Sequence, residues 1–555
     1  MAIRINPIAL SIHHDDAALR KKVISLLRIP ETELKEVQIR RRSIDARKKE
    51  DILYSYMLDV TVEHEARVLK KNRDVRVTQA ETVSYAAPSH GEETLLHRPV
   101  VVGSGPAGLF AGLLLAREGY HPIILERGLP VEERARVIDR FWKRGILDPE
   151  CNVSFGEGGA GTFSDGKLNT LVKDRFGRNQ EVLKAFVRFG ADEEILWEQK
   201  PHVGTDRLIG IIRGIREEIL DLGGEIRFSA CVSRLVKEDN RLRGVILKDG
   251  VKIPCSVLIA AIGHSARDSI QRFYEQGIRM EAKPFAVGLR IQHPQHLIDV
   301  SQYGEREAAF LSPAPYKLTG KSRDGRGVYT FCMCPGGYVV NASSEEGMTA
   351  VNGMSYHDRN SKNANSAVIV TVFPEEYGGT ENPLAGILFQ RELETRAYRA
   401  GKGKIPVQLY GDFCAGIISS EFRTVSPCFR GETQFADLNL VLGSSISQAL
   451  RDGMSQFDRK IRGFALPDAI LAGVESRTSS PVRILRDSSF VSSLDGFYPC
   501  GEGAGYAGGI MSAAMDGMKV AEAVIHRYAP CRTAEEGRKQ NGLTPVSKQS
   551  KLDNQ

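Results

Sequence analysis

The stretch PVVVGSGPAGLFAGLLLAREGYHPIILERG, residues Pro99–Gly128, decides the fold of this chain. It begins with an apolar run at 100–102 that leads directly into a glycine-rich segment at 103–108. An apolar pattern with helical spacing continues to about residue 117, and a second apolar run at 122–125 ends on Glu126. This order predicts a strand, a tight turn, a helix and a second strand that ends on an acid.

Each part of this unit has a physical role in binding a dinucleotide. Gly103 allows the sharp turn, Gly105 lets a pyrophosphate approach the backbone, and Gly108 lets the helix pack closely on the strand. The positive end of the helix then faces the phosphates. Glu126 lies near the spacing expected for an acid that holds a ribose. The alternative is a tight turn that binds nothing, but the complete strand–turn–helix–strand–acid order favours a dinucleotide site.

The same glycine spacing occurs twice more, at 156–161 and at 503–508. Neither copy is followed by a strand that ends on an acid, so neither predicts a second dinucleotide unit. The first copy lies in SFGEGGAGTFSDGKL, 154–168, where glycines alternate with Ser, Thr and Lys. This composition predicts a backbone surface rich in N–H donors, suited to a phosphate or a flat ring, against the alternative of a mobile surface loop.

Length and composition restrict the class of protein. The chain has 555 residues, 42% of them hydrophobic, and a formal charge of +6. It is therefore expected to be globular, and its mild charge gives no strong sign of a nucleic-acid partner. Its nine cysteines form no disulfide framework, which favours a reducing compartment. No apolar leader opens the chain and no span suits a bilayer, so a cytoplasmic protein without a membrane partner is expected.

The chain divides by pattern into five parts. They are a small α+β domain (1–75), a polar linker (76–95), a nucleotide domain in two pieces (96–280 and 466–529), an inserted β-rich domain (281–465) and a disordered tail (530–555). In the first part, apolar or aromatic residues occupy every second position from Ile52 to Val62, which predicts a strand. Residues 37–41 suggest the strand that pairs with it. The basic run 40–49 suits RNA or an acidic partner, but lacks interleaved aromatic residues, which favours a solvated strand end.

Six further motifs resemble a known family. They are GEGGAGTFSDGKL (156–168), AIGHSARD (261–268), FCMCPGGYVV (331–340), NGMS with NANS (352–355, 363–366), ESRTSSPVRILR (475–486) and GEGAGYAGGIM (501–511). With the opening unit, the chain resembles a family of uncharacterised bacterial FAD-dependent dehydrogenases, within the glutathione-reductase-type flavoproteins. The resemblance covers most of residues 96–527. It implies an α/β fold with a Rossmann-like FAD-binding domain, an inserted β-rich α+β domain and a small N-terminal α+β domain.

The resemblance implies a role for each cofactor-binding candidate. The first turn would hold the FAD pyrophosphate, Glu126 the adenosine ribose and the backbone of Val232 the adenine, while Glu502 would bond a ribityl hydroxyl. A helix start at Gly508, Gly509 and Ile510 would face the flavin N1–C2=O edge, where it stabilises the anionic reduced ring. The complete set of candidates is Gly103, Ser104, Gly105, Pro106, Ala107, Gly108, Glu126, Arg127, Gly158, Gly159, Gly161, Thr162, Ser164, Lys167, Val232, Ala261, Gly263, Gly501, Glu502, Gly508, Gly509 and Ile510.

Three side chains are candidates for catalysis. His264 follows a strand end and could move a proton near neutral pH; the alternative is a hydrogen-bonded structural histidine. Lys167 and Asp165 could contact the flavin or the substrate, or could form an ion pair at the loop surface. Cys332 and Cys334 fall on one face of an alternating strand and are interpreted as a buried apolar face rather than a metal or dithiol site. No metal ligand set is expected.

These observations predict an FAD-dependent oxidoreductase that transfers hydride or electrons to or from a small molecule held over the flavin by the insert. NADH or NADPH is a candidate transient reductant, because no second dinucleotide unit is complete. Three alternatives stay open: an FAD-dependent RNA-modifying enzyme that uses the 40–49 run, a non-enzymatic FAD-binding redox sensor, and an enzyme acting on lipid-like substrates. The substrate, the electron partner and the oligomeric state are not predicted.

Overall fold

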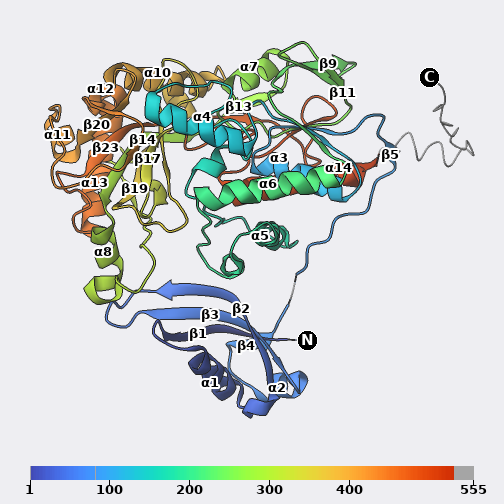
Figure 1. Ribbon diagram of the computed structural model, residues 1–555, viewed down its shortest axis with the longest axis vertical. Coiled ribbons are helices and arrows are strands. Elements are labelled where there is room, and N and C mark those ends of the chain that lie inside the picture. The colour runs from blue at the N-terminus through green and yellow to red at the C-terminus, as the bar shows by residue number, and fades with distance from the viewer. Residues whose placement is uncertain (1, 82, 531–555) are drawn as a thin grey trace, which may run out of the picture.

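The computed structural model describes residues 2–81 and 83–530. Figure 1 shows a small N-terminal part, which lies below two larger parts that pack against each other. The expected tail, 530–555, lies outside the described residues except for its first position. Within the described ranges, no helix combines the length and the apolar character needed to cross a membrane.

A five-stranded sheet with the order β25-β12-β6-β7-β8 forms the centre of one large part, and each neighbouring pair is parallel. Its strands are β6 (Val100–Val102), β7 (Ile123–Leu125), β8 (Glu225–Arg227), β12 (Leu258–Ala260) and β25 (Phe497–Pro499). All of them except β8 are fully buried, as expected for a parallel sheet covered on both faces. The predicted opening strand, helix and second strand are confirmed, with the helix α3 at Pro106–Arg117.

Helices cover this sheet and bring distant segments together. Helix α14 (Ile510–Arg527) packs on α3 so closely that a Cβ on Gly517 would lie 2.1 Å from the carbonyl oxygen of Ala107. The remaining elements here are α4 (Val131–Arg144), η2 (Ala160–Phe163), α5 (Arg178–Arg188), η3 (Glu193–Leu196), α6 (Thr205–Asp221), β9 (Val232–Glu238), β10 (Arg241–Leu247), β11 (Lys252–Pro254), α7 (Arg267–Glu275), β13 (Met280–Ala282), β24 (Val482–Ile484), β5 (Glu93–Thr94) and β26 (Tyr528–Ala529). Among these elements, β9 and β10 pair as an antiparallel hairpin.

A seven-stranded mixed sheet with the order β15-β16-β19-β14-β23-β20-β22 forms the second large part. Its strands are β14 (Phe285–Pro294), β15 (Thr319–Lys321), β16 (Gly327–Cys334), β19 (Asn363–Val372), β20 (Ile405–Leu409), β22 (Thr433–Phe435) and β23 (Ile470–Glu475). The strand β23 lies beyond the expected boundary at 465, yet it pairs with both β14 and β20. A short buried apolar run carries no local sign of which sheet it joins, so the sequence pattern placed it in the wrong domain.

The remaining elements of this part surround that sheet. They are α8 (Gln295–Glu307), β17 (Tyr338–Asn341), β18 (Val351–Met354), α9 (Pro374–Tyr377), α10 (Ala385–Ala400), α11 (Tyr410–Ala415), β21 (Phe429–Arg430), α12 (Leu438–Leu442) and α13 (Ser444–Lys460). The strands β17, β18 and β21 form a separate three-stranded sheet. Figure 1 shows α10, α12 and α13 on the outside of this part, away from α3 and α14.

The N-terminal part is a four-stranded antiparallel sheet with two helices. The strands are β1 (Ile3–Ser11), β2 (Leu34–Asp45), β3 (Leu53–Val62) and β4 (Val77–Gln79), with α1 (Asp16–Leu27), η1 (Glu31–Glu33) and α2 (Glu65–Lys71). Alternating residues of β3 are buried against α1, and the side chain of Asp15 caps α1 by accepting from the Ala18 amide at 2.7 Å. The strand β4 lies within the expected linker 76–95. It pairs with β1 and therefore belongs to the N-terminal sheet.

Three of the six basic residues at 40–49 pair with acids. Arg40 and Arg4 both bond the buried carboxylate of Asp59, at 2.7 and 2.8 Å between Nε and the nearest oxygen. Arg42 bonds Glu198 of the part built on the parallel sheet, and so joins the two parts. Arg47 bonds Asp45 on the same strand end. These pairs neutralise part of the charge that an RNA backbone would require.

Replacing Asp59 with asparagine is expected to destabilise the N-terminal part by about 2–3 kcal/mol, because two arginines lose charge-assisted hydrogen bonds. Burial opposes ionisation of Asp59, but the bonds from Arg4 and Arg40 outweigh it and lower its pKa. The stabilisation is therefore present above the unfolded pKa near 4 and is lost as pH falls through the lower folded value. Thermal unfolding at pH 7 and at pH 3 measures both effects. The control is Asp45→Asn, which removes a carboxylate that bonds the exposed side chain of Arg47. Equal melting of the Asp59 and Asp45 variants at pH 7 would contradict this account.

Candidate functional site

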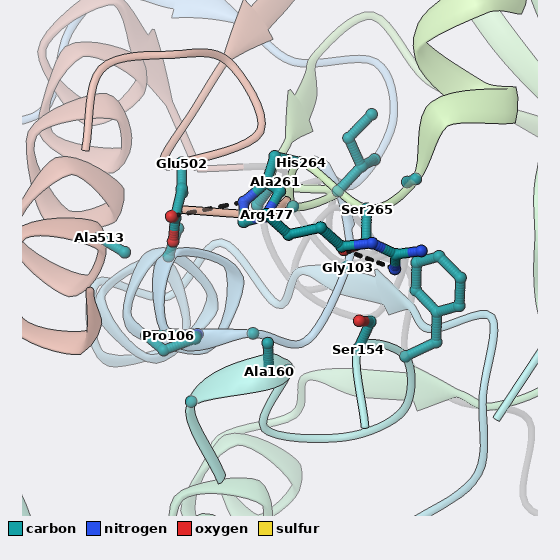
Figure 2. Close-up of a pocket in the computed structure, with 18 of the residues that line it drawn as sticks. Gly103, Pro106, Ser154, Ala160, Ala261, His264, Ser265, Arg477, Glu502 and Ala513 are labelled. Carbon is teal, nitrogen blue, oxygen red and sulfur yellow. Dashed lines mark hydrogen bonds and ion pairs between the residues drawn. The ribbon is translucent and has the colours of Figure 1, made fainter. Parts of the chain in front are cut away.

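One cavity runs between the parallel sheet and the inserted part. Its walls come from the turn after β6, the glycine-rich loop 154–167, the segment after β12, the start of α14 and three segments of the insert. Figure 2 shows Pro106 and Ala160 on one side of it, with His264 and Glu502 on the other. The cavity thus collects segments that are far apart in sequence but meet at the carboxyl ends of parallel strands, where ligands bind in open α/β sheets.

The three glycines of the first turn have different surroundings. A Cβ on Gly103, where φ is +98°, would lie 2.4 Å from the Ala261 carbonyl oxygen, and one on Gly108 would lie 1.8 Å from the Gly103 carbonyl oxygen. A Cβ on Gly105 would meet only the Gly159 Cα, at 3.7 Å, on the cavity side. Protein packing therefore requires the first and third glycines, whereas the second leaves space that a ligand can occupy.

Helix α3 begins at this turn, and no side chain of the described residues caps its N-terminus. Its first amides and the positive end of its dipole therefore face the cavity beside Gly105. The residues present thus fit the pyrophosphate of a dinucleotide: open backbone at Gly105, uncapped helix amides, and a second glycine loop opposite.

That second loop packs directly on the first. The Gly158 amide donates to the Ser104 carbonyl oxygen at 2.9 Å, and Gly159 lies against Gly105. The loop is held from behind by Arg134 of α4, a fully buried side chain that donates to five of its carbonyl oxygens. Burial lowers the pKa of Arg134 to about 10, so it stays charged at neutral pH. No role was predicted for Arg134 from the sequence.

Glu126 lines the cavity, but its carboxylate is heavily used by the protein. One oxygen accepts from the amide and hydroxyl of Ser104, at 2.9 and 2.7 Å, and the other from the amides of Gly128 and Gly156, at 2.9 and 3.0 Å. Glu126 therefore fastens the two glycine loops to the end of β7. A ribose hydroxyl would have to share one of these oxygens.

The opposite end of the cavity is formed by the start of α14 and by Glu502. Gly509 and Ile510 line the cavity, and within the described residues no side chain caps this helix either. Glu502 Oε1 lies 3.4 Å from Nδ1 of His264 (Figure 2). Gly508 lies outside the lining of the cavity. Its amide donates to the Ser512 hydroxyl at 3.0 Å.

The candidates predicted from sequence divide into two groups. Those that line the cavity are Gly103, Gly105, Pro106, Ala107, Glu126, Arg127, Gly159, Gly161, Ser164, Asp165, Lys167, Val232, Ala261, Gly263, His264, Glu502, Gly509 and Ile510. Those that do not are Ser104, Gly108, Gly158, Thr162, Gly501 and Gly508. Most of the second group support the lining: Ser104 positions Glu126, and the Gly501 amide donates to Asp516 at 2.7 Å.

Asp165 is the centre of an ion-pair network rather than one half of a surface pair. It is 1% exposed and lies 3.4 Å from the Lys167 amine, 3.5 Å from His202 and 3.2 Å from Arg359. Burial alone would raise its pKa, but Lys167 and Arg359 hold the pKa well below its usual range. The alternative of a loop ion pair at the surface is therefore wrong for Asp165, while Lys167 faces the cavity.

The insert supplies a wall that the sequence pattern did not predict residue by residue. It consists of Phe331, Cys332, Asn352, Glu475, Arg477 and Thr478. Other lining residues that were missed include Ser154, Phe155, Cys231, Ser265, Ser269 and Ala513. Several of these residues lie within or beside the six motifs, and that position was the sequence signal by which they could have been found. The insert wall is polar apart from Phe331.

The interpretation of Cys332 as part of a buried apolar face is wrong. The strand β16 breaks its pairing between Phe331 and Cys334, and Cys332 takes a left-handed backbone conformation with φ +44°. Cys332 therefore lines the cavity, while Cys334 is fully buried. Strict alternation fails here because a bulge inserts an extra residue into one strand.

A buried carboxylate fixes Arg477 in this wall. Glu394 of α10 bonds Arg477 at 2.7 Å and Arg267 of α7 at 2.6 Å, and both arginines hold the pKa of Glu394 well below its usual range despite its burial.

Among the described residues, no cluster of three or more His, Cys, Asp or Glu side chains could hold a metal ion.

Comparison with known families gives two matches. Residues 284–478 match the family described as FAD-dependent protein, C-terminal domain-like, and residues 2–61 match a domain of unknown function. The first match begins one residue before β14 and extends past β23, so it covers the whole seven-stranded sheet.

Similar solved structures are distant. An L-proline dehydrogenase from P. horikoshii is 11% identical with a TM-score of 0.31, covering 78% of this chain and 93% of that one. A geranylgeranyl bacteriochlorophyll reductase-like protein from Thermoplasma acidophilum is 11% identical with a TM-score of 0.32, covering 82% and 80%. Likenesses this weak carry no argument about function.

One relative is much more similar. A Clostridium beijerinckii protein described as uncharacterized is 47% identical over 533 residues, which cover 95% of this chain and 99% of the relative. Identity at this level along almost the full length establishes common family membership. Residues 284–478 match the family described as FAD-dependent protein, C-terminal domain-like, and the chain belongs to the same family as this relative.

Proposed function

We propose that the protein is an FAD-dependent oxidoreductase that exchanges hydride or electrons with a small, polar substrate. The observation that supports this most directly is the single cavity that joins two uncapped helix starts, at α3 and α14, through open backbone at Gly105. The first start suits a pyrophosphate and the second an anionic ring edge. The match of residues 284–478 to an FAD-dependent family agrees with this proposal.

The residues that would hold FAD divide along the cavity. Gly105, Pro106, Ala107 and Gly159 would surround the pyrophosphate, and Val232 and Glu126 the adenosine. Gly509 and Ile510 would lie at the flavin end, with Gly161 beside them, since a Cβ there would lie 2.8 Å from Cγ1 of Ile510. Bound flavin supplies two-electron chemistry at its ring, and the protein supplies binding and electrostatics.

The chain's own groups would orient the substrate and move protons. Asn352, Arg477 and Lys167 present amide, guanidinium and ammonium donors on the insert side of the cavity. These donors favour a polar or anionic substrate over a lipid-like one. His264, oriented by Glu502 at 3.4 Å, is placed to hold a proton at the other side.

The first test is an absorbance spectrum of the purified protein, followed by anaerobic addition of NADH and then NADPH. A flavin spectrum that bleaches with either nucleotide supports a reductase. A flavin that does not bleach would indicate that the substrate itself is the reductant or that the protein is a sensor. Protein that carries no flavin and takes none up from added FAD would overturn the proposal.

The RNA-modifying alternative has its own test. Binding of RNA that weakens steeply as salt rises would support it, because neutralised phosphates release counterions. The pairing of Arg40 and Arg42 with Asp59 and Glu198 argues against it. We therefore expect no RNA binding at low salt.

A further inference from the structure

The bulge in β16 brings two cysteines together at the cavity. Phe331 pairs with Ala367 and Cys334 pairs with Asn365, so Cys332 and Met333 together oppose the single residue Ser366 on β19. In a regular strand, Cys332 and Cys334 would stand side by side at a fixed spacing. The bulge and the left-handed backbone of Cys332 instead fold it back, and Cys334 Sγ donates to the Cys332 carbonyl oxygen at 3.3 Å.

The two thiols differ in access. Cys332 is half-buried and lines the cavity beside Lys167 and Asn352, whereas Cys334 has no exposed surface and lies behind it. A reagent in the cavity therefore reaches Cys332 first, and Cys334 is buried next to Cys332. This is the arrangement of an attacking thiol and a resolving thiol.

A fully buried arginine fixes the pair. Arg290 of β14 donates to the Cys332 carbonyl oxygen and lies 3.4 Å from Cys334 Sγ. Its guanidinium also bonds Glu475 at 2.9 Å and Asn365 at 2.7 Å. The pair thus sits on a rigid sheet rather than on a flexible loop.

The charges around Cys332 favour its thiolate. The cations facing the cluster are Lys167, Arg290 and, through Asp165, Arg359; the carboxylates are Asp165 and Glu475. Three cations against two carboxylates leave one positive charge, which a thiolate at Cys332 neutralises. The hydrogen bond from Cys334, with the charges of Lys167 and Arg290, lowers the pKa of Cys332 below its ordinary value, while burial raises the pKa of Cys334 well above its ordinary range.

We propose that Cys332 and Cys334 form a redox-active dithiol that exchanges with low-molecular-weight disulfides entering the cavity. The Cys332 thiolate attacks one sulfur of the disulfide, forming a mixed disulfide and releasing one thiolate. Cys334 then attacks Cys332 Sγ, loses its proton, and releases the second thiolate as the intramolecular disulfide closes. The protein dithiol loses two electrons and the small disulfide gains them. This activity goes beyond the proposed function and needs no bound flavin.

The sequence allows a direct test, because trypsin cleavage after Arg326 and Arg359 yields one peptide, Gly327–Arg359, that contains Cys332 and Cys334 as its only cysteines. Flavin-free full-length protein is equilibrated anaerobically in glutathione buffers of increasing oxidised fraction, quenched in acid, alkylated and digested. The expected result is a peptide that loses two hydrogens and resists alkylation as the buffer becomes oxidising. A peptide that takes two alkyl groups at every ratio would overturn the proposal.

Variants separate the two roles. Cys334→Ser is expected to stop at a glutathione adduct on Cys332, and Cys332→Ser to form neither adduct nor disulfide. Cys428→Ser, which removes a buried cysteine outside this cluster, is the matched control and should behave as the unmodified protein. A wild-type peptide that carries glutathione without closing would show that Cys334 does not resolve, and would contradict the pairing.

A second readout follows the ionisation of Cys332. Iodoacetamide labelling of the reduced protein, measured on the same peptide from pH 4 to 9, is expected to reach half its maximal rate well below about pH 8.5. At pH 6 its rate should exceed that of a small reference thiol, since greater ionisation outweighs the lower nucleophilicity of a less basic sulfur. A midpoint near 8.5, the ordinary thiol value, would contradict the electrostatic argument.

Discussion

Replacing Gly105 with alanine is expected to weaken FAD binding by at least about 100-fold, equivalent to roughly 2.7 kcal/mol, without destabilising the protein. The backbone at Gly105 has φ −71°, which alanine adopts freely, and a Cβ there would meet only the Gly159 Cα at 3.7 Å. The added methyl group would instead occupy the space in which a pyrophosphate approaches the α3 amides. Titration of flavin-free protein with FAD, together with thermal unfolding in the absence of FAD, measures the two quantities separately.

Gly108→Ala is the matched comparison, and its expected effect is the reverse. A Cβ there would lie 1.8 Å from the Gly103 carbonyl oxygen, so α3 must shift away from β6. Overpacking against backbone is expected to lower the stability of the flavin-free protein by about 1–3 kcal/mol or more. If Gly105→Ala binds FAD as tightly as the unmodified protein, the phosphates do not lie on this turn.

The sequence predicted what local physics determines. The order around Gly103, Gly105 and Gly108 required a turn, a helix and a parallel strand pair, and β6, α3 and β7 follow it almost to the residue. It also predicted that Glu126 would lie at the cavity. It did not predict that all four hydrogen bonds to this carboxylate come from the protein, because Gly156 is 30 residues further along the chain.

Features set by long-range packing escaped prediction. Alternation assigned Cys332 to a buried face, but a bulge opposite Ser366 turned it toward the cavity. The strand β23 belongs to the insert because it fits between β14 and β20, and its six residues carry no mark of that choice. In both cases the deciding contacts lie more than thirty residues away, where strand patterns carry no information.

Replacing Arg134 with methionine is expected to cost about 3–5 kcal/mol of stability, or to prevent folding of the loop it holds. Its three guanidinium nitrogens donate to the carbonyl oxygens of Asn152, Val153, Gly156, Glu157 and Gly159, and its guanidinium lies 4.8 Å from the centre of the Phe163 ring. A methionine of similar length fills the volume but donates nothing, so buried carbonyl groups lose their partners. Chemical unfolding of the flavin-free protein measures the loss.

Arg134→Lys tests whether charge or geometry matters at this position. Lysine keeps the charge, but its single ammonium group cannot reach carbonyl oxygens that surround a planar fork, so we expect it to recover less than half of the lost stability. Arg136→Lys, an exposed position on the same helix, is the control and should change little. Because the loop held by Arg134 packs against Gly105 at the edge of the cavity, both Arg134 variants should also weaken FAD binding. If Arg134→Lys is as stable as the unmodified protein, charge alone accounts for the role of this residue, and the five directed hydrogen bonds do not determine the shape of the loop.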